Sequence, residues 1–167
     1  ITFENGTTQI ADSLFAGCVG IEEVTIPNTV TSIEWGAFQD CLALKKVVVG
    51  NSVTNIGYRA FDGCVNLPQI SLPDSLTKIA DAAFEGCTEF TVVRIPASML
   101  SIDERVFSNC GNLVAVEIPD SIISISNSAF SGCEDLNSIV LSSNITSIDD
   151  TALPDNLRTV YTYKNSY

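Results

Sequence analysis

Apolar residues recur along this chain at a constant interval of 23 positions. Three columns of the repeat each keep a single residue type: isoleucine, phenylalanine or cysteine. They comprise Ile10, Ile33, Ile56, Ile79, Ile102, Ile125 and Ile148, then Phe15, Phe38, Phe61, Phe84, Phe107 and Phe130, and finally Cys18, Cys41, Cys64, Cys87, Cys110 and Cys133. A fixed period of this length is typical of a solenoid, in which equivalent residues stack in successive coils.

A short alternating segment in each period predicts a strand. Val24 and Ile26, like their copies, are apolar at every second position, so two side chains of each strand are expected to point inward. Most copies are followed by a proline, which ends the strand because it has no N–H for a ladder. These prolines are Pro27, Pro73, Pro96 and Pro119.

A tight turn is predicted between the phenylalanine and cysteine columns. The residue before each cysteine belongs to the types that adopt a positive φ with the least strain, namely Gly17, Asp40, Gly63, Gly86, Asn109 and Gly132. We therefore expect a short helical turn that ends in a left-handed residue at this position.

The full pattern, LxxLxLPxxVxxIxxxAFxxC, resembles the leucine-rich repeats of the BspA-like, or treponeme-type, family. Residues 42–64, LALKKVVVGNSVTNIGYRAFDGC, match it at almost every position. The resemblance implies a repeat solenoid, a right-handed arc of about seven 23-residue coils. A parallel β-sheet would form its concave face and short helical turns its convex face. The turn after the strand departs from other leucine-rich repeats, because a column of mainly hydroxyl residues replaces the usual buried asparagine: Thr29, Ser52, Ser75, Ser98, Ser121 and Asn144.

The uninterrupted period predicts one leucine-rich-repeat domain over residues 1–167. Residues 146–167 form a degenerate coil or C-terminal cap, because this last repeat loses the cysteine and the phenylalanine. The chain begins inside a strand, at Ile1 and Phe3, which suggests a piece of a longer protein. An uncapped first strand also predicts self-association through that edge.

Charge and composition narrow the function classes. The net charge of −12 arises from 20 acidic and 8 basic residues without a basic patch, which disfavours nucleic acid and anionic membranes as partners. No apolar stretch reaches 18 residues, so membrane insertion is not expected. The chain has no histidine and its carboxylates are scattered, so we expect neither an enzyme nor a cofactor site.

The cysteines and the acidic residues each have a plausible ligand role that we weigh against a structural one. One cysteine per coil, without a CxxC pair, is not a zinc spacing, and parallel Cβ vectors disfavour disulfides, so buried free thiols are expected. Acidic residues precede the turns, where we expect them to act as caps. A calcium site is the alternative, but the ligand-dense loop that it requires is missing. These acids are Asp12, Glu34, Asp81, Asp103, Glu104, Asp149 and Asp150.

The outward positions of the strands vary from coil to coil, whereas the inward columns do not. In leucine-rich repeats these positions line the concave face, and from them we predict the ligand-binding residues Lys46, Val48, Gln69, Ser71, Val92, Arg94 and Glu117. The alternative is that the valines only favour the strand and that Arg94 only pairs with Glu117.

Other irregularities are weaker candidates. Leu100 and Ile123 interrupt a column otherwise held by threonine, and Trp35 and Tyr58 occupy one column in adjacent coils. Two glycosylation sequons, at Asn5 and Asn144, would matter only in a secreted eukaryotic protein.

These features predict a non-catalytic protein-binding module. The resemblance implies a cell-surface or secreted setting and adhesion to host cells, matrix proteins or other microbes. The alternatives are a structural stalk that projects another domain and an intracellular scaffold.

Overall fold

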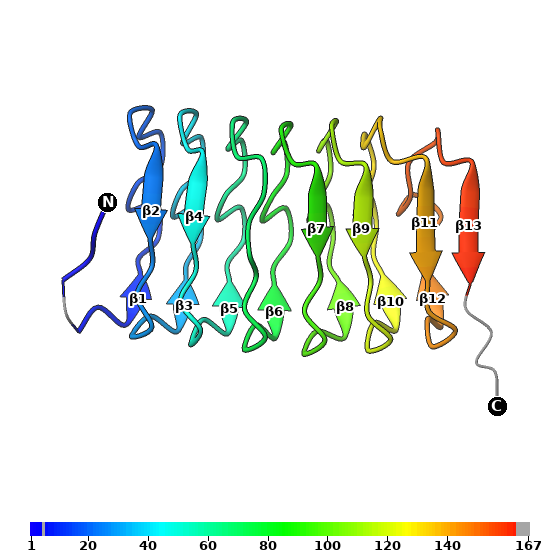
Figure 1. The fold of residues 1–167 in the computed structure, drawn as a ribbon, viewed down its shortest axis with the longest axis horizontal. Coiled ribbons are helices and arrows are strands. Elements are labelled where there is room, and N and C mark those ends of the chain that lie inside the picture. The colour runs from blue at the N-terminus through cyan, green and yellow to red at the C-terminus, as the bar shows by residue number, and fades with distance from the viewer. Residues whose placement is uncertain (5, 163–167) are drawn as a thin grey trace.

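The computed structural model describes residues 1–4 and 6–162 as a right-handed solenoid of about seven coils (Figure 1). Most coils contribute a strand of two to four residues to each of two sides. The first set comprises β2 (Glu23–Thr25), β4 (Lys46–Val48), β7 (Val92–Arg94), β9 (Ala115–Glu117), β11 (Ser138–Leu141) and β13 (Thr159–Thr162). The second set comprises β1 (Gln9–Ile10), β3 (Ser32–Ile33), β5 (Asn55–Ile56), β6 (Lys78–Ile79), β8 (Ser101–Ile102), β10 (Ser124–Ile125) and β12 (Ser147–Ile148).

The strands pair in parallel with the register that the sequence predicts. Val24 lies opposite Val47, and Ile33 lies opposite Ile56, each one period on. The last pair, β11 and β13, is offset by two residues, so that Ile139 lies opposite Val160. The cause is the shorter last repeat, which lacks two residues between Leu153 and Leu157. The sequence pattern therefore determines the stacking of the coils.

The first strand set is interrupted, although we expected one continuous sheet. It forms three two-stranded sheets, β2–β4, β7–β9 and β11–β13. Residues 69–71, the equivalent segment between β4 and β7, are joined to β4 by a single bridge between Val48 and Ser71. Pro68 explains the interruption at residues 69–71, because it has no N–H with which to extend the ladder, but it does not account for the break between β9 and β11. The second set, which the sequence did not predict as strands, forms a four-stranded sheet and a three-stranded sheet.

The turns are not helical, which corrects the prediction for the convex side. In residues 1–4 and 6–162 no helix is assigned. Instead Gln39 N–H donates to Gly36 O (3.0 Å) and Cys41 N–H donates to Phe38 O (3.2 Å), as in consecutive β-turns. The alternate amides of this turn donate to the next coil instead, for example Phe38 N–H to Ala60 O at 2.8 Å. A helix cannot form here because alternate N–H groups bond outside the coil.

The predicted left-handed residues are confirmed. All six residues that precede a cysteine have φ between 55° and 74°. A second left-handed column, with φ between 51° and 57°, lies four residues earlier, at Ser13, Gly36, Arg59, Ala82, Arg105 and Ser128. Arg59, Ala82 and Arg105 are not residue types that favour this region, so the second column carried no signal in the sequence.

The core contains the isoleucine, phenylalanine and cysteine columns together with the inward valines, leucines and alanines between them. Five phenylalanines, from Phe38 to Phe130, are completely buried, and successive rings from Phe15 onward stack with centroids 5.2–5.7 Å apart. At the N-terminal end Phe3 packs edge-on against Phe15, at 6.0 Å. Residues 1–3 do not form a strand, but Ile1 accepts a hydrogen bond from Thr25 N–H at 3.3 Å.

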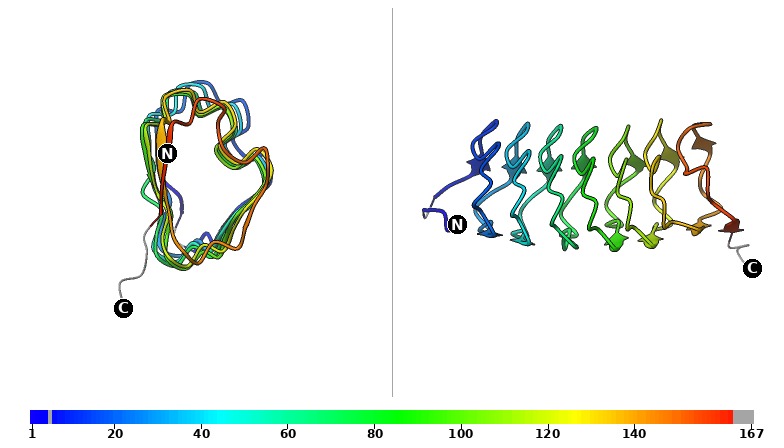
Figure 2. Two further views of the ribbon diagram at one scale, coloured as in Figure 1. Left: turned by 90° about the vertical axis from the view of Figure 1, so that its right-hand side faces the viewer. Right: turned by 90° about the horizontal axis from the view of Figure 1, so that it is seen from above.

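The stack runs nearly straight over its length (Figure 2). The expected concave face is therefore only slightly curved. We call this face the strand face and define it as the outward side chains of β2, β4, β7, β9, β11 and β13 and of residues 69–71. The described residues include no helix of the length and apolarity that a membrane span requires.

Candidate functional site

All seven predicted ligand-binding residues are exposed on the strand face. Val48 and Val92 are 45% and 42% exposed, so two valines lie in solvent at the middle of the molecule. The neighbouring inward residues, Val47 next to Val48 and Val93 next to Val92, are buried. Alternation along each strand therefore separates a fixed core side from a variable outer side, as predicted.

Six of the seven residues line one hollow of about 530 Å³, which we call the β4–β7 hollow. Its walls come from β4 and β7, and its floor comes from residues 68–71. Ser71, which is small, lies between the larger Val48 and Arg94 in one row of outward positions. The predicted members are Lys46, Val48, Gln69, Ser71, Val92 and Arg94.

A second hollow of about 380 Å³, the β9 hollow, adjoins the first. It is lined by Arg94 and Glu117, together with apolar residues such as Ile118, Pro119 and Val140. Arg94 lines both hollows, so its guanidinium lies between them. All seven predicted residues thus border two adjacent depressions on one face.

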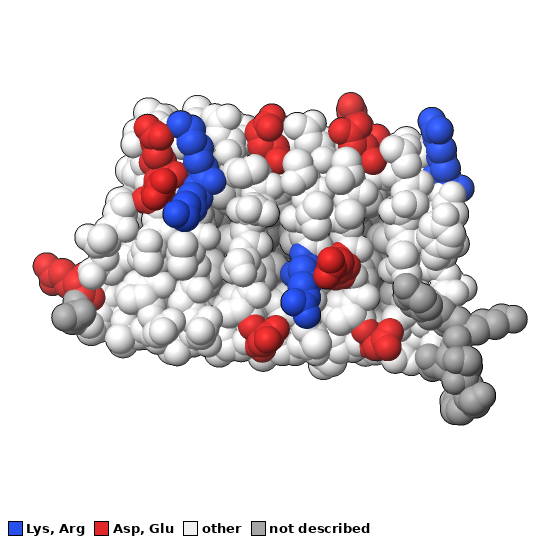
Figure 3. Space-filling model, viewed as in Figure 1, with Lys and Arg blue, Asp and Glu red and all other residues white. Residues whose placement is uncertain are grey.

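On this face two groups combine acidic and basic side chains, further charged side chains stand singly along the edges, and most of the surface between them is uncharged (Figure 3). Lys45 Nζ lies 2.9 Å from Glu22 Oε2, and Arg94 Nε lies 3.7 Å from Glu117 Oε2. The hydrogen bond from Lys45 holds the pKa of Glu22 below its usual value. The predicted pairing of Arg94 with Glu117 is confirmed, but both side chains are largely exposed, so the pair contributes little to stability.

Four lining residues of the β4–β7 hollow were not among the predicted ones: Val47 and Ile70, which are buried inward positions, and the exposed Lys45 and Pro68. Lys45 and Pro68 both line it, although they precede the alternating segments and were not counted among the outward strand positions. Pro68 could have been noticed in the sequence, because it places a proline in a column where the other coils have residues with an N–H. In the structure Lys45 and Thr91 of this column donate that N–H to the preceding coil at 2.8 and 3.1 Å.

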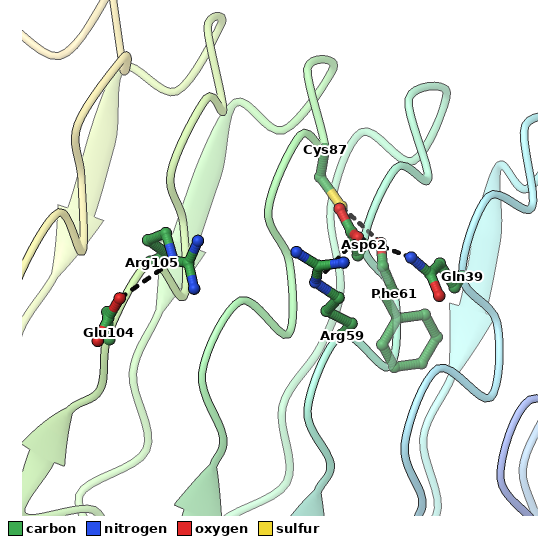
Figure 4. A network of polar contacts seen from close by, with 7 residues as sticks. All are labelled: Gln39, Arg59, Phe61, Asp62, Cys87, Glu104 and Arg105. Atoms are coloured by element: carbon green, nitrogen blue, oxygen red, sulfur yellow. Dashed lines mark hydrogen bonds and ion pairs between the residues drawn. The ribbon is translucent and has the colours of Figure 1, made fainter.

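The opposite, turn side carries a polar cluster that connects successive coils (Figure 4). Gln39 Nε2 donates to Asp62 Oδ2 at 3.0 Å, and Arg59 Nε lies 3.7 Å from the same oxygen. Partial burial raises the pKa of Asp62, with Arg59 opposing the rise and Glu85 adding to it. Among the described residues one carboxylate oxygen of Glu85 is buried without a hydrogen-bond partner. These contacts hold the turns together.

The thiols are free, and five of the six are buried. Each buried Sγ donates to the carbonyl of a phenylalanine 26 residues earlier, for example Cys64 to Phe38 at 3.2 Å. Burial raises the pKa of Cys41 to about 11 and that of Cys133 to about 12. A proton that is held this tightly makes a thiol unreactive, so the column is part of the core.

Among the predicted caps, Asp149 bonds an N–H of its own turn, whereas Asp12 bonds the next coil instead. Asp12 Oδ1 accepts the Trp35 N–H of the next coil at 3.1 Å, and Asp149 Oδ1 accepts the Thr151 N–H at 3.0 Å. The hydrogen bonds from Thr151 lower the pKa of Asp149. Within residues 1–4 and 6–162 no cluster of three or more histidine, cysteine or acidic side chains is placed to hold a metal ion.

The hydroxyl column bonds the turn after the strand only in part. Ser75 Oγ donates to Val53 O at 2.7 Å, and Ser98 Oγ donates to Leu76 O at 2.5 Å. Asn144 Nδ2 donates to Asp120 O in the same way, at 2.9 Å. The hydroxyl of Ser121 is buried without a partner among the described residues.

The weaker candidates are exposed but do not adjoin the strand-face hollows. Leu100 is 63% exposed and borders a separate hollow of about 430 Å³ between β6 and β8. Trp35 and Tyr58 are exposed on the turn side, where the Arg59 guanidinium lies 5.2 Å from the Tyr58 ring centre. Of the two sequons, Asn144 bonds a neighbouring coil, and Asn5 lies outside the described residues.

The parallel coils, the invariant inward columns and the strand face define a leucine-rich-repeat solenoid. The chain belongs to the family described as "BspA type Leucine rich repeat region (6 copies)", whose model matches residues 1–111 and 54–165. The predicted family is therefore confirmed. No curated protein matches the chain.

Solved structures share this fold. A leucine-rich repeat protein from Bacteroides ovatus is 34% identical, with a TM-score of 0.88 over 96% of this chain and 43% of its own. A leucine rich cell surface protein from Faecalibacterium prausnitzii is 30% identical, with a TM-score of 0.81 over 100% of this chain and 46% of its own. The pneumococcal vaccine antigen PcpA, at 22% identity and a TM-score of 0.77, covers 98% of this chain and 41% of its own and shares the fold alone. The chain thus spans less than half the length of these proteins.

Proposed function

We propose that the chain is a protein-binding module of a cell-surface or secreted protein and that the strand face is its binding surface. The observation that carries the proposal is that all seven outward residues selected for their variability border two adjacent hollows. Exposed valines in a hollow provide apolar contact area, and Arg94 between the hollows is of a residue type enriched at binding hot spots.

Adhesion to host cells, matrix proteins or other microbes is the specific role that we propose. It is supported by the description of the Faecalibacterium prausnitzii relative as a cell surface protein.

A triple substitution tests this proposal: Val48→Ser, Val92→Ser and Arg94→Ala. Binding of the purified chain to intact cultured host cells and to a panel of immobilised matrix proteins is measured by surface plasmon resonance and cell-adhesion assays. We expect the variant to lose binding by about tenfold or more, because hot-spot residues dominate an interface. Circular dichroism should be unchanged, because all three side chains are exposed.

The matched control changes the same chemistry elsewhere. Val19→Ser, Leu42→Ser and Lys78→Ala also remove two exposed apolar side chains and one cation, but outside the strand face. Binding should be retained. If the two triple variants bind equally well, the strand face is not the binding surface, and the stalk becomes the better account.

A further inference from the structure

The β4–β7 hollow has a charge opposite to that of the molecule. Lys45, Lys46 and Arg94 line it, so three of the chain's 8 basic residues border one depression, and none of its 20 acidic residues does. The protein as a whole carries −12. At physiological salt the Debye length is about 8 Å, so a ligand in the hollow interacts mainly with these cations and the acids next to them rather than with distant charges of the chain.

The acids that pair with these cations lie outside the hollow. Lys45 and Lys46 pair with Glu22 and Glu23 at 2.9 and 4.0 Å, on the β2 side. Arg94 pairs with Glu117 at 3.7 Å, on the β9 side. Along the strand face the charge therefore runs acidic, basic, uncharged, basic, acidic, with the uncharged centre formed by Pro68, Gln69 and Ser71. Figure 3 shows both oppositely charged groups, one at the upper left and one near the centre, with uncharged surface between them.

These ion pairs leave the cations available to a ligand. Their side chains are 61–80% exposed, and exposed pairs of this kind are weak enough to be exchanged. Lysine has three N–H donors and arginine has five, so each can bond a second carboxylate while its present partner stays nearby.

The dimensions suit an extended peptide. One coil separates β4 from β7, so the two cationic walls lie roughly 10 Å apart at the usual strand spacing of about 4.8 Å. An extended segment advances about 3.3 Å per residue, so three residues span that distance. Val48 and Val92 offer apolar contact on either wall.

We propose that the β4–β7 hollow binds a short acidic segment of a protein partner, with carboxylates at Lys46 and Arg94. The inference rests on the proposed function, because it assigns a chemical class to the partner of the same face. It does not require the adhesion role to be correct, because the binding can be measured on the purified chain with a synthetic peptide.

The test uses two decapeptides, one of alternating glutamate and serine and one of alternating glutamine and serine, which differ in charge but hardly in shape. Each peptide is titrated into the full chain at about 0.15 M salt, where screening weakens the interaction of the peptide with distant charges of the chain. Binding is followed through the NMR methyl shifts of Val48 and Val92. The glutamate peptide should bind and shift both methyl groups, and the glutamine peptide should bind at least tenfold more weakly.

Two pairs of variants assign the binding to the hollow. Lys46→Ala with Arg94→Ala should weaken the glutamate peptide about tenfold, whereas Lys78→Ala with Arg158→Ala, which removes the same charge from exposed sites elsewhere, should not. Conversely, Glu23→Gln with Glu117→Gln removes the competing carboxylates and should tighten binding severalfold. Glu134→Gln with Asp155→Asn is the control of equal charge and should have little effect.

Each outcome decides the inference separately from the proposed function. Equal binding of both peptides, or undiminished binding by the Lys46/Arg94 variant, overturns the acidic-segment proposal. If that happens while the strand-face triple variant still loses adhesion, the binding surface stands and only the partner's chemistry is wrong. If the peptide binds as expected but adhesion is unaffected, the hollow recognises acidic segments and the adhesion role fails.

Discussion

Phe84 is the residue on which the stability of the stack should depend most. Its ring is completely buried and lies 5.4 Å from Phe61, 5.7 Å from Phe107 and 5.5 Å from Phe90. Phe84→Ala removes contacts to three rings and leaves a cavity, so it should cost about 3–5 kcal/mol. Urea denaturation measures the loss. Glu89→Ala, at an exposed position in the same coil, should change stability by less than about 0.5 kcal/mol, and equal losses would show that the register is wrong.

The thiol column predicts a loss of stability in alkali. Burial raises the pKa of Cys87 well above its usual value, so above about pH 8.5 this thiol releases its proton only in the unfolded chain. Its stabilising contribution is therefore complete below the unfolded pKa and is lost as the pH rises. The free energy of unfolding should fall by about 1.4 kcal/mol per pH unit for each such thiol. Denaturation between pH 8 and 11 checks this, and Cys87→Ala should have a slope shallower by one proton. Identical slopes would contradict a buried thiol.

Single positions were predictable from the sequence where the 23-residue columns assign them. Val48 and Val92 are exposed and the inward columns are buried from Ile33 to Cys133 as predicted, because alternation and period fix which side a residue takes. Burial is incomplete at the ends of the stack, where Phe15 and Cys18 are partly exposed and Ile148 is 37% exposed. The left-handed φ of Ala82 and Arg105 was not predictable. At these positions the hydrogen bonds between coils impose the backbone conformation on residues that do not favour it.

Among the elements, the segment between β4 and β7 differs from its copies in one residue that borders the β4–β7 hollow, Pro68. Pro68→Thr restores an N–H where Thr91 has one in the next coil, and should extend the ladder from β4 across the hollow. The net gain in stability should be below about 1 kcal/mol, because proline also restricts the unfolded chain. Hydrogen exchange is the sharper measurement: the new amide and that of Gln69 should become protected. Pro73→Ala is the control, and unprotected amides would show that Pro68 is not the cause of the interruption.

Strands were easier to predict than turns, for a physical reason. An alternating segment such as 24–26 carries its own signal, whereas the short pairs such as Ser32–Ile33 are strands only because the next coil supplies a partner. The predicted helical turn failed for the same reason. Its spacing fits a helix, but alternate amides bond the adjacent coil, which local sequence does not reveal.

The whole molecule joins a regular interior to an irregular face. The family, the register and the stacked core follow from a period that persists through six cysteines. The two hollows do not follow from it, because their volumes depend on the relative heights of side chains in three neighbouring coils. The outward columns identified which residues border them, and only the structure showed that Lys45 and Pro68 complete the larger one.

The net charge of −12 gives a prediction for the whole molecule. Repulsion among 20 acidic residues opposes the compact state, and salt screens it, with a Debye length falling from about 30 Å at 0.01 M to about 8 Å at 0.15 M. Salt also weakens the ion pairs, but those on the strand face are exposed and contribute little. The Tm should therefore rise by about 2–4 °C over this range, as expected for a gain of about 1 kcal/mol.

A variant of lower charge checks that repulsion is the cause of this rise. Four exposed acids that form no ion pair among the described residues are changed to amides, which moves the net charge from −12 to about −8: Asp74→Asn, Asp120→Asn, Glu134→Gln and Asp155→Asn. Its Tm should be higher than that of the natural chain at low salt, and the two should converge as salt is added, because screening removes the difference between them. Calorimetry in sodium chloride and in choline chloride separates screening from binding of a particular cation. A Tm that falls with salt would mean that the ion pairs outweigh the repulsion, and the exposed pairs flanking the β4–β7 hollow would then be too strong to exchange with a ligand.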